Sequence, residues 1–248
     1  MKKRLFNAAV ALTAAFALTT SVSPAQAATS VPDSPGATTR STTDIATILA
    51  AVKKAYDVYK SFSQGGTSGQ DATALILNAI QSAQTAIISH IDAIATAEAR
   101  ACARSAVVDF PNFEALTTDN RQAFALAATS CATRIESLLG TVTDLGAVDQ
   151  LGFSLNAVGP IALITRSRTG LTNPSFVPVL VSSNQTVVTR LAPACHPHTD
   201  LEGATEYVCL AYNGDRAADY PLTNSQNAAM QRTSWPVAKS VLPQLTSL

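Results

Sequence analysis

The chain has 248 residues, with 17 basic and 17 acidic side chains, and only 14% of its residues are charged. Three of the basic residues, Lys2, Lys3 and Arg4, stand at the very start, so the rest of the chain carries 14 basic and 17 acidic residues. A weakly acidic chain lacks the positive surface that nucleic-acid binding requires, so we exclude nucleic acid as a partner.

The first 27 residues have the pattern of a signal peptide. A basic start precedes the apolar run Leu5 to Leu18, and Ala25-Gln26-Ala27 fits the small-x-small rule for cleavage. This run is shorter than a comfortable membrane span. We therefore expect residues 1–27 to be removed, giving a secreted, extracellular protein with no integral membrane span in the mature chain. Residues 28–40 are rich in Pro, Gly, Ser and Thr and predict a flexible N-terminal arm.

Residues 41–170 predict an antiparallel helical bundle. The range 41–63 has apolar residues at helical spacing and predicts the first helix. Asp71 to Asp109 carries the longest such pattern and predicts one continuous central helix with Asp71 as its N-cap. Further helices are expected at about 119–140 and at 143–167. The expected buried stripe of the central helix is Ile76, Ile80, Ala83, Ile87, Ile91, Ile94, Ala97, Ala101, Ser105 and Val108.

Four cysteines, an even number in an exported chain, suggest two disulfides, for which the sequence allows three connectivities. Cys102 lies near the end of the expected central helix, and Cys131 lies in the helix that follows. In an antiparallel hairpin these residues would lie roughly 12 Å and 18 Å from the connection, a difference of about one helical turn. The spacing therefore favours the pairs Cys102–Cys131 and Cys195–Cys209.

Residues 171–248 predict a small, disulfide-stapled C-terminal subdomain of mixed α/β structure, because helical periodicity fades and prolines become frequent. Phe176 to Arg190 fits either a short helix or strands. Glu206 to Tyr212 predicts a strand from its β-branched and aromatic residues, and Asn213-Gly214 predicts a tight turn after it. The tail predicts one more helix, interrupted at Trp235-Pro236.

The segment most like a site is Cys195-His196-Pro197-His198. Two histidines flank a proline, with carboxylates nearby, and such side chains can bind zinc or copper. The spacing matches no standard structural zinc motif, and Cys195 is better used in a disulfide. We therefore expect no metal and no cofactor, with His196 and His198 as the only candidate ligands. His90 is expected to be a partly buried structural residue.

No catalytic motif is present. The sequence has no Gly-x-Ser-x-Gly elbow, no phosphate-binding Gly-rich loop and no His-Glu-x-x-His pair. Its three histidines are few for acid–base chemistry. We assign no catalytic residue, and the sequence favours a protein that is not an enzyme.

Three segments resemble those of a known family. They are RACARSAVVDF at 100–110, AVDQLGFSLNAVGPIAL at 147–163 and EYVCLAYNGD at 206–215. They look like a family of uncharacterised secreted proteins from actinobacteria, and the likeness covers most of the mature chain. The resemblance implies a shared fold and secretion, and it implies no activity.

The sequence thus favours a secreted, non-enzymatic binding protein or a cell-envelope-associated protein. Its expected partner is a protein, an envelope component or a small molecule. One alternative is a helical pore-forming toxin or toxin component, because Leu151 to Thr165 and most of Asp71 to Asp92 are free of charge. The other alternative is a hydrolase with an unrecognised site.

Overall fold

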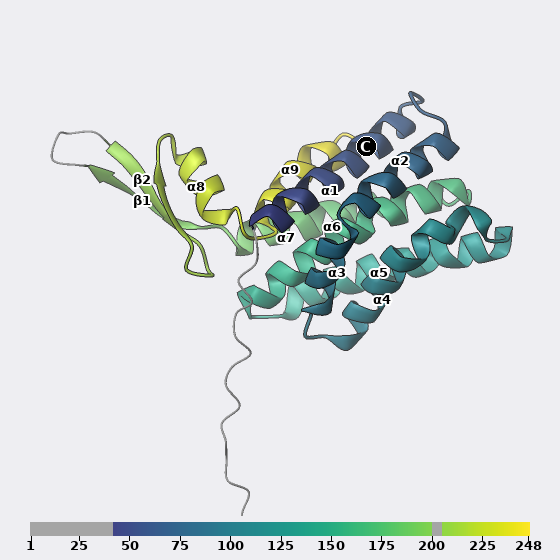
Figure 1. The fold of residues 1–248 in the computed structure, drawn as a ribbon, viewed down its shortest axis with the longest axis horizontal. Helices are drawn as coiled ribbons and strands as arrows, with labels where there is room; N and C mark the ends of the chain where they lie inside the picture. Colours follow the sequence, from purple (N-terminus) through teal and green to yellow (C-terminus); the bar gives the residue numbers. More distant parts are fainter. Residues whose placement is uncertain (1–41, 200–204) are drawn as a thin grey trace, which may run out of the picture. The chain divides into compact units, whose positions relative to one another are not determined.

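The computed structural model describes residues 42–199 and 205–248, so the expectations for residues 1–27 and 28–40 lie outside the described residues. The described chain is mainly helical, with one small antiparallel sheet (Figure 1). The expected class is confirmed: a helical bundle with a long central helix and a disulfide-stapled C-terminal sheet. The helices are α1 (Thr42–Ser63), α2 (Gly69–Ser82), α3 (Gln84–Asp92), α4 (Ala97–Asp109), the 3-10 helix η1 (Phe110–Ala115), α5 (Thr118–Thr141), α6 (Leu145–Arg168), α7 (Val177–Arg190), α8 (Leu222–Met230) and α9 (Trp235–Leu245). The strands are β1 (Ala194–Thr199), β2 (Thr205–Leu210) and β3 (Arg216–Asp219).

Helix α6 is the central helix of the bundle. Its N-cap is Asp144, whose carboxylate accepts a hydrogen bond from the Ala147 N–H at 2.7 Å. Every residue from Leu151 to Thr165 is buried, because helices α1 to α5, α7 and α9 pack around it (Figure 1). The segment holds no charged side chain, so its burial takes no ionised group out of water. Among the described helices, α6 is also the one that is long and apolar enough to cross a membrane, and 89% of its apolar window is buried.

Helix α1 approaches α6 closely at Gly159. A side chain at this position would overlap the hydroxyl of Tyr56, which lies directly over the glycine. Tyr56 is 1% exposed, and its hydroxyl has no hydrogen-bond partner among the described residues. Burial raises the pKa of the Tyr56 hydroxyl far above its ordinary value of 10.0, so the group stays neutral.

Gly159→Ala is expected to lower the free energy of unfolding by about 1–3 kcal/mol, because the added methyl group overpacks this crossing. Tyr56→Phe removes the oxygen that the methyl group would meet, so Gly159→Ala should cost clearly less in that background. Urea unfolding of the four proteins measures both effects. An equal cost in the two backgrounds would show that Tyr56 is not the obstacle.

The expected continuous helix from Asp71 to Asp109 is wrong. The segment forms three helices, α2, α3 and α4, which are separated at Ala83 and at residues 93–96. Arg104 Nη1 lies 2.6 Å from Asp92 Oδ1 across the second break. In an unbroken helix these two residues would be about 18 Å apart along the axis, so the chain turns sharply between them.

The start of this region also differs from the expectation. Helix α2 begins at Gly69, and its N-cap is Ser68 instead of Asp71. The Asp71 N–H donates to Ser68 Oγ at 3.1 Å, and the Ser68 hydroxyl donates to the Asp71 carboxylate at 2.6 Å. The Ser68 hydroxyl thus caps a backbone N–H of the first turn and is itself held by the Asp71 carboxylate.

The second break changes the buried face of α4. A non-helical segment resets the helical phase, so the stripe extrapolated from α2 and α3 does not continue into α4. Four positions of the expected stripe fall in α4, and all four are exposed: Ala97, Ala101, Ser105 and Val108. The residues buried instead are Ala99, Ala103, Ala106 and Val107.

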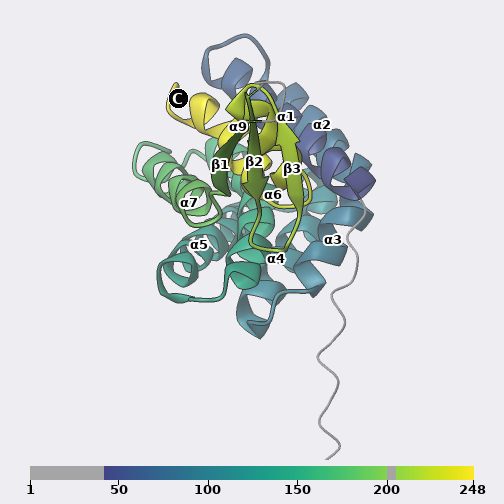
Figure 2. The ribbon, with the colours of Figure 1, turned by 90° about the vertical axis from the view of Figure 1, so that its left-hand side faces the viewer.

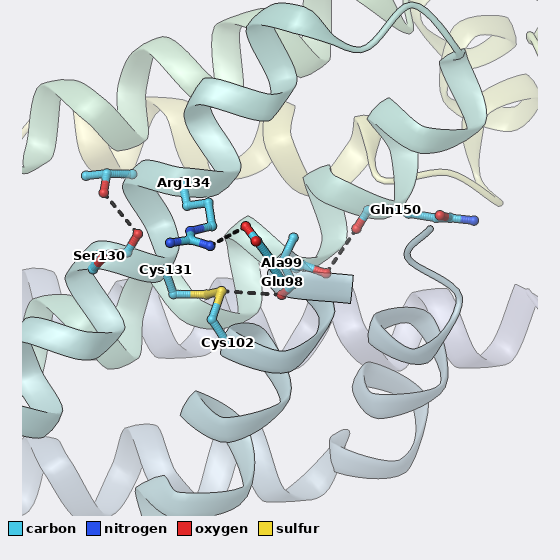
Figure 3. The surroundings of a disulfide bond; sticks show 9 residues. Glu98, Ala99, Cys102, Ser130, Cys131, Arg134 and Gln150 are labelled. Carbon is cyan, nitrogen blue, oxygen red and sulfur yellow. Dashed lines mark hydrogen bonds and ion pairs between the residues drawn. A yellow bond between two sulfur atoms is a disulfide. The ribbon is translucent and has the colours of Figure 1, made fainter. Parts of the chain in front are cut away.

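A disulfide between Cys102 and Cys131 joins α4 to α5, as predicted (Figure 3). The two Cα atoms are 5.5 Å apart, and the link closes a loop with a sequence separation of 29. Arg134 forms an ion pair with Glu98 beside it, joining the same two helices. Both side chains of that pair are exposed, so the ion pair contributes at most about 1 kcal/mol and the covalent link dominates.

The sheet has the order β1-β2-β3, with both neighbouring pairs antiparallel (Figure 2). Cys195 and Cys209 stand directly opposite each other in the register of β1 and β2, and they form the second predicted disulfide. Helix α8 packs on β2 and β3, where the Ser225 hydroxyl lies 2.6 Å from the Tyr207 carbonyl oxygen. The strands and α8 thus make up the small mixed part of the fold.

Helical packing continues past residue 170. The undecided segment Phe176 to Arg190 is a helix, α7, which contacts α5, α6 and α9. The tail forms two helices, α8 and α9, separated at residues 231–234. Since α9 also packs along α1, the C-terminal part contributes two helices to the bundle.

Candidate functional site

The two candidate metal ligands lie on the sheet. His196 and His198 are exposed residues of β1 and stand opposite Val208 and Glu206 of β2. The Cys195 sulfur is bonded to Cys209. Within residues 42–199 and 205–248, no three His, Cys, Asp or Glu side chains are grouped so that they could hold a metal ion. The described residues therefore offer these histidines no third ligand.

His90 has a structural position. Its side chain is 5% exposed and packs on the ring of Phe153, with the ring centroids 4.2 Å apart. This contact joins α3 to the central helix α6. A histidine so buried is out of reach of a substrate in solution.

Two buried polar groups connect α6 to the chain that follows it. The Asp149 carboxylate accepts hydrogen bonds from the Tyr212 hydroxyl at 2.8 Å and from the Ser234 N–H at 2.5 Å. The Asn156 amide donates to Asn184 Oδ1 at 2.8 Å. Asp149 and Asn156 are fully buried, so their role is to hold the fold together.

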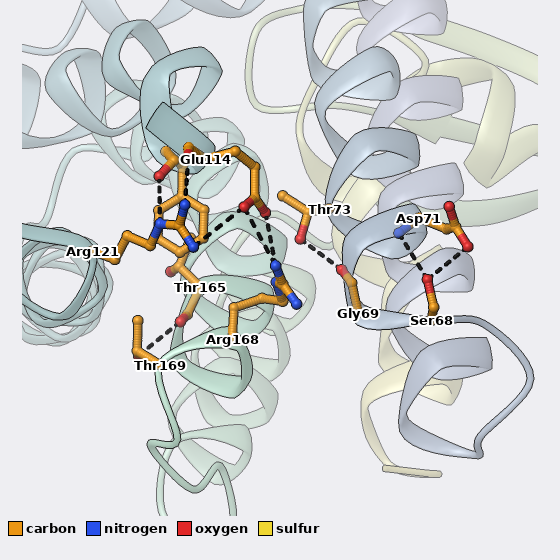
Figure 4. A network of polar contacts seen from close by, with 10 residues as sticks. Ser68, Gly69, Asp71, Thr73, Glu114, Arg121, Thr165, Arg168 and Thr169 are labelled. Atoms are coloured by element: carbon orange, nitrogen blue, oxygen red, sulfur yellow. Dashed lines mark hydrogen bonds and ion pairs between the residues drawn. The ribbon is translucent and has the colours of Figure 1, made fainter. Parts of the chain in front are cut away.

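A cluster of charged side chains, Glu114 with Arg121 and Arg168, holds helices of the bundle together (Figure 4). Glu114 lies between Arg168 and Arg121, at 3.2 Å and 3.5 Å respectively. Arg121 donates further hydrogen bonds to the Phe113 and Glu114 carbonyl oxygens. Because the carboxylate and both guanidinium groups are engaged, the cluster ties η1 to α5 and α6 and leaves little capacity for a ligand.

A groove opens where the C-terminal ends of α1 and α9 meet α7, and we call it the α7 groove. It encloses about 580 Å³, within the roughly 300–1,000 Å³ typical of small-molecule sites. Val177, Pro178 and Val181 of α7 contribute apolar surface, and Leu245 of α9 adds to it. The buried ring of Tyr59 in α1 forms its inner end. No side chain that lines the groove is charged.

The polar atoms at the inner end of the α7 groove are already hydrogen-bonded. Asn173 Nδ2 donates to the Tyr59 hydroxyl at 2.5 Å and to Ser167 Oγ at 2.8 Å. The Ser167 hydroxyl in turn donates to the Leu163 carbonyl oxygen at 3.1 Å. Arg166 Nε donates to Asn173 Oδ1 at 2.9 Å, which fixes the orientation of the amide. A ligand in the groove therefore needs no hydrogen bond to these atoms.

No known protein-family model and no curated protein matches the sequence. No solved structure matches the fold. The resemblance to secreted actinobacterial proteins stays a prediction. The function proposed below therefore depends on the geometry of the α7 groove.

The sequence did not reveal the α7 groove. Its walls come from three segments that are far apart in the chain, and the apolar residues involved have the same spacing as ordinary core residues. The segment from Phe176 to Arg190 had left the choice between helix and strand open, so even the wall formed by α7 was not assigned. Without the position of α7 against α1 and α9, no groove could be inferred.

Proposed function

We propose that this chain is an exported, non-enzymatic binding protein that holds a small, uncharged and mainly apolar molecule in the α7 groove. The observation that carries the proposal is the combination of a mainly apolar lining, in which no side chain is charged, with inner polar atoms that already have partners. An ionised ligand would lose hydration there without gaining a counter-charge. An apolar ligand gains roughly 25 cal/mol for each Å² of surface removed from water.

The disulfides support the exported part of the proposal. Two disulfides are consistent with an oxidising or extracellular environment, since cytosolic thiols are kept reduced. The signal-peptide pattern of residues 1–27 agrees with this location.

A pore-forming activity is the second candidate, and α6 is the observation that favours it. Its length and apolar composition suit a membrane span. To reach a bilayer, however, α6 would have to leave seven packed helices and break the buried hydrogen bonds of Asp149 and Asn156. Dye release from liposomes over a range of lipids and pH tests this candidate, and we expect none.

Val181→Lys is expected to weaken binding of a neutral apolar probe such as Nile red by about tenfold or more, because it brings a charge into the α7 groove. Val181 is half-buried, so the lysine can reach solvent and the fold should persist. Fluorescence titration measures the dissociation constant.

Val108→Lys is the matched control for this variant. Val108 lies on helix α4, is 42% exposed and does not line the α7 groove. The control variant should bind the probe as the unmodified chain does, and circular dichroism should show the same helix content in all three proteins. Equal affinity of both variants for the probe would count against the α7 groove as the site.

A further inference from the structure

A second groove lies at the other end of the α1–α9 pair, and we call it the Lys239 groove. It encloses about 500 Å³ between the first turns of α1, the end of α8 and the start of α9. Ile45, Leu49 and Pro236 give it an apolar wall. Asn227 and Gln231 contribute amide groups. In contrast to the α7 groove, its lining includes a charged side chain, Lys239.

The ammonium group of Lys239 lies over an aromatic ring, while the side chain as a whole is exposed. It lies 4.3 Å from the centroid of the Trp235 ring, a cation–π contact. Trp235 is 3% exposed and its indole N–H donates to the Val188 carbonyl oxygen at 3.1 Å, so the ring is fixed. Among residues 42–199 and 205–248, no carboxylate lies within ion-pair distance of Lys239. The groove therefore holds a positioned positive charge that the described chain does not neutralise.

The backbone at the start of α9 offers little to an anion. The Ser234 N–H is bonded to Asp149, and the Trp235 N–H is bonded to Thr233 Oγ1 at 3.3 Å. Pro236 has no N–H. The donors that line this groove for a negative group are the side chain of Lys239 and the amides of Asn227 and Gln231.

We propose that the Lys239 groove binds a long-chain carboxylate, that is, a fatty acid. The carboxylate meets the Lys239 ammonium, and the alkyl chain covers Ile45, Leu49 and Pro236. One positive charge suits a group with one negative charge, whereas a phosphate monoester carries up to two at neutral pH. This inference is independent of the proposed function, since the two grooves share no lining residue.

The test uses the full chain and two fluorescent probes, 11-(dansylamino)undecanoate and the corresponding primary amide. The two probes differ only in the charge of the head group. The unmodified chain should bind the carboxylate about tenfold more tightly than the amide. Lys239→Gln should abolish this ratio, whereas Lys239→Arg should keep it. A purely structural role of Lys239 on Trp235 would alter stability without changing the ratio.

Two further variants identify the groove that is occupied. Leu49→Trp fills the Lys239 groove and should weaken binding of the carboxylate, whereas Val181→Trp, which fills the α7 groove, should leave it unchanged. An unchanged ratio in Lys239→Gln would overturn the proposal. Loss of carboxylate binding in Val181→Trp alone would overturn it as well, since the fatty acid would then occupy the α7 groove. Absence of Nile red binding with an intact carboxylate preference would count against the proposed function only.

Discussion

Asp149→Ala is expected to lower the free energy of unfolding by about 3 kcal/mol. The substitution leaves the Tyr212 hydroxyl and the Ser234 N–H without their acceptor, and the cost of an unsatisfied buried donor is about 1–3 kcal/mol. Because these donors precede and follow α8, the carboxylate joins the central helix to the mixed C-terminal part. Urea unfolding followed by circular dichroism measures the loss.

Asp144→Ala provides the comparison for Asp149→Ala. Asp144 is an exposed N-cap on the same helix, and its loss should cost only about 1 kcal/mol. Asp149→Ala should also speed proteolysis between β1 and α9, because this segment loses its tie to α6. A loss of stability no larger than that of the N-cap variant would contradict the role given to Asp149.

The double substitution Cys102→Ser and Cys131→Ser is expected to cost about 3 kcal/mol. The disulfide closes a loop with a sequence separation of 29, and its removal enlarges the conformational freedom of the unfolded chain. The midpoint temperature of thermal unfolding should fall, while the helix content of the folded state stays unchanged because α4 and α5 still pack against each other.

Reduction with dithiothreitol is the control for this variant. The reduced chain loses both disulfides, so it should be less stable than the double variant by the contribution of Cys195–Cys209. If the oxidised double variant unfolds at the same temperature as the unmodified chain, the Cys102–Cys131 link is not a staple of the bundle.

Elements marked by apolar periodicity, by a lack of charged residues or by the spacing of cysteines could be predicted from the sequence. The first helix was expected at 41–63 and is found at Thr42–Ser63. The uncharged segment Leu151 to Thr165 falls within the helix expected at 143–167, and it is the buried part of α6. Both disulfide pairs followed from the spacing of the cysteines. The two helical segments are decided by residues that are neighbours in sequence or lie on one helical repeat, whereas the disulfides are decided by the spacing of four cysteines.

The errors have a common physical origin. Ala83 and residues 93–96 interrupt the helical region without a Gly or Pro, so we attribute the breaks to the packing of α2, α3 and α4 on α6. Tertiary packing overrode a regular local pattern. The α7 groove was missed for a related reason: it depends on where three helices leave space, and no short sequence window contains that information.

The most direct test of the central claim is to locate a neutral apolar molecule on the folded chain. A long-chain hydrocarbon carrying a nitroxide broadens nearby methyl signals in the NMR spectrum through paramagnetic relaxation. We expect broadening of Val177, Val181 and Leu245, with the methyl groups of Val107 in α4 unaffected. Uniform broadening over the surface, or broadening that spares Val177 and Val181, would contradict the α7 groove as the binding site.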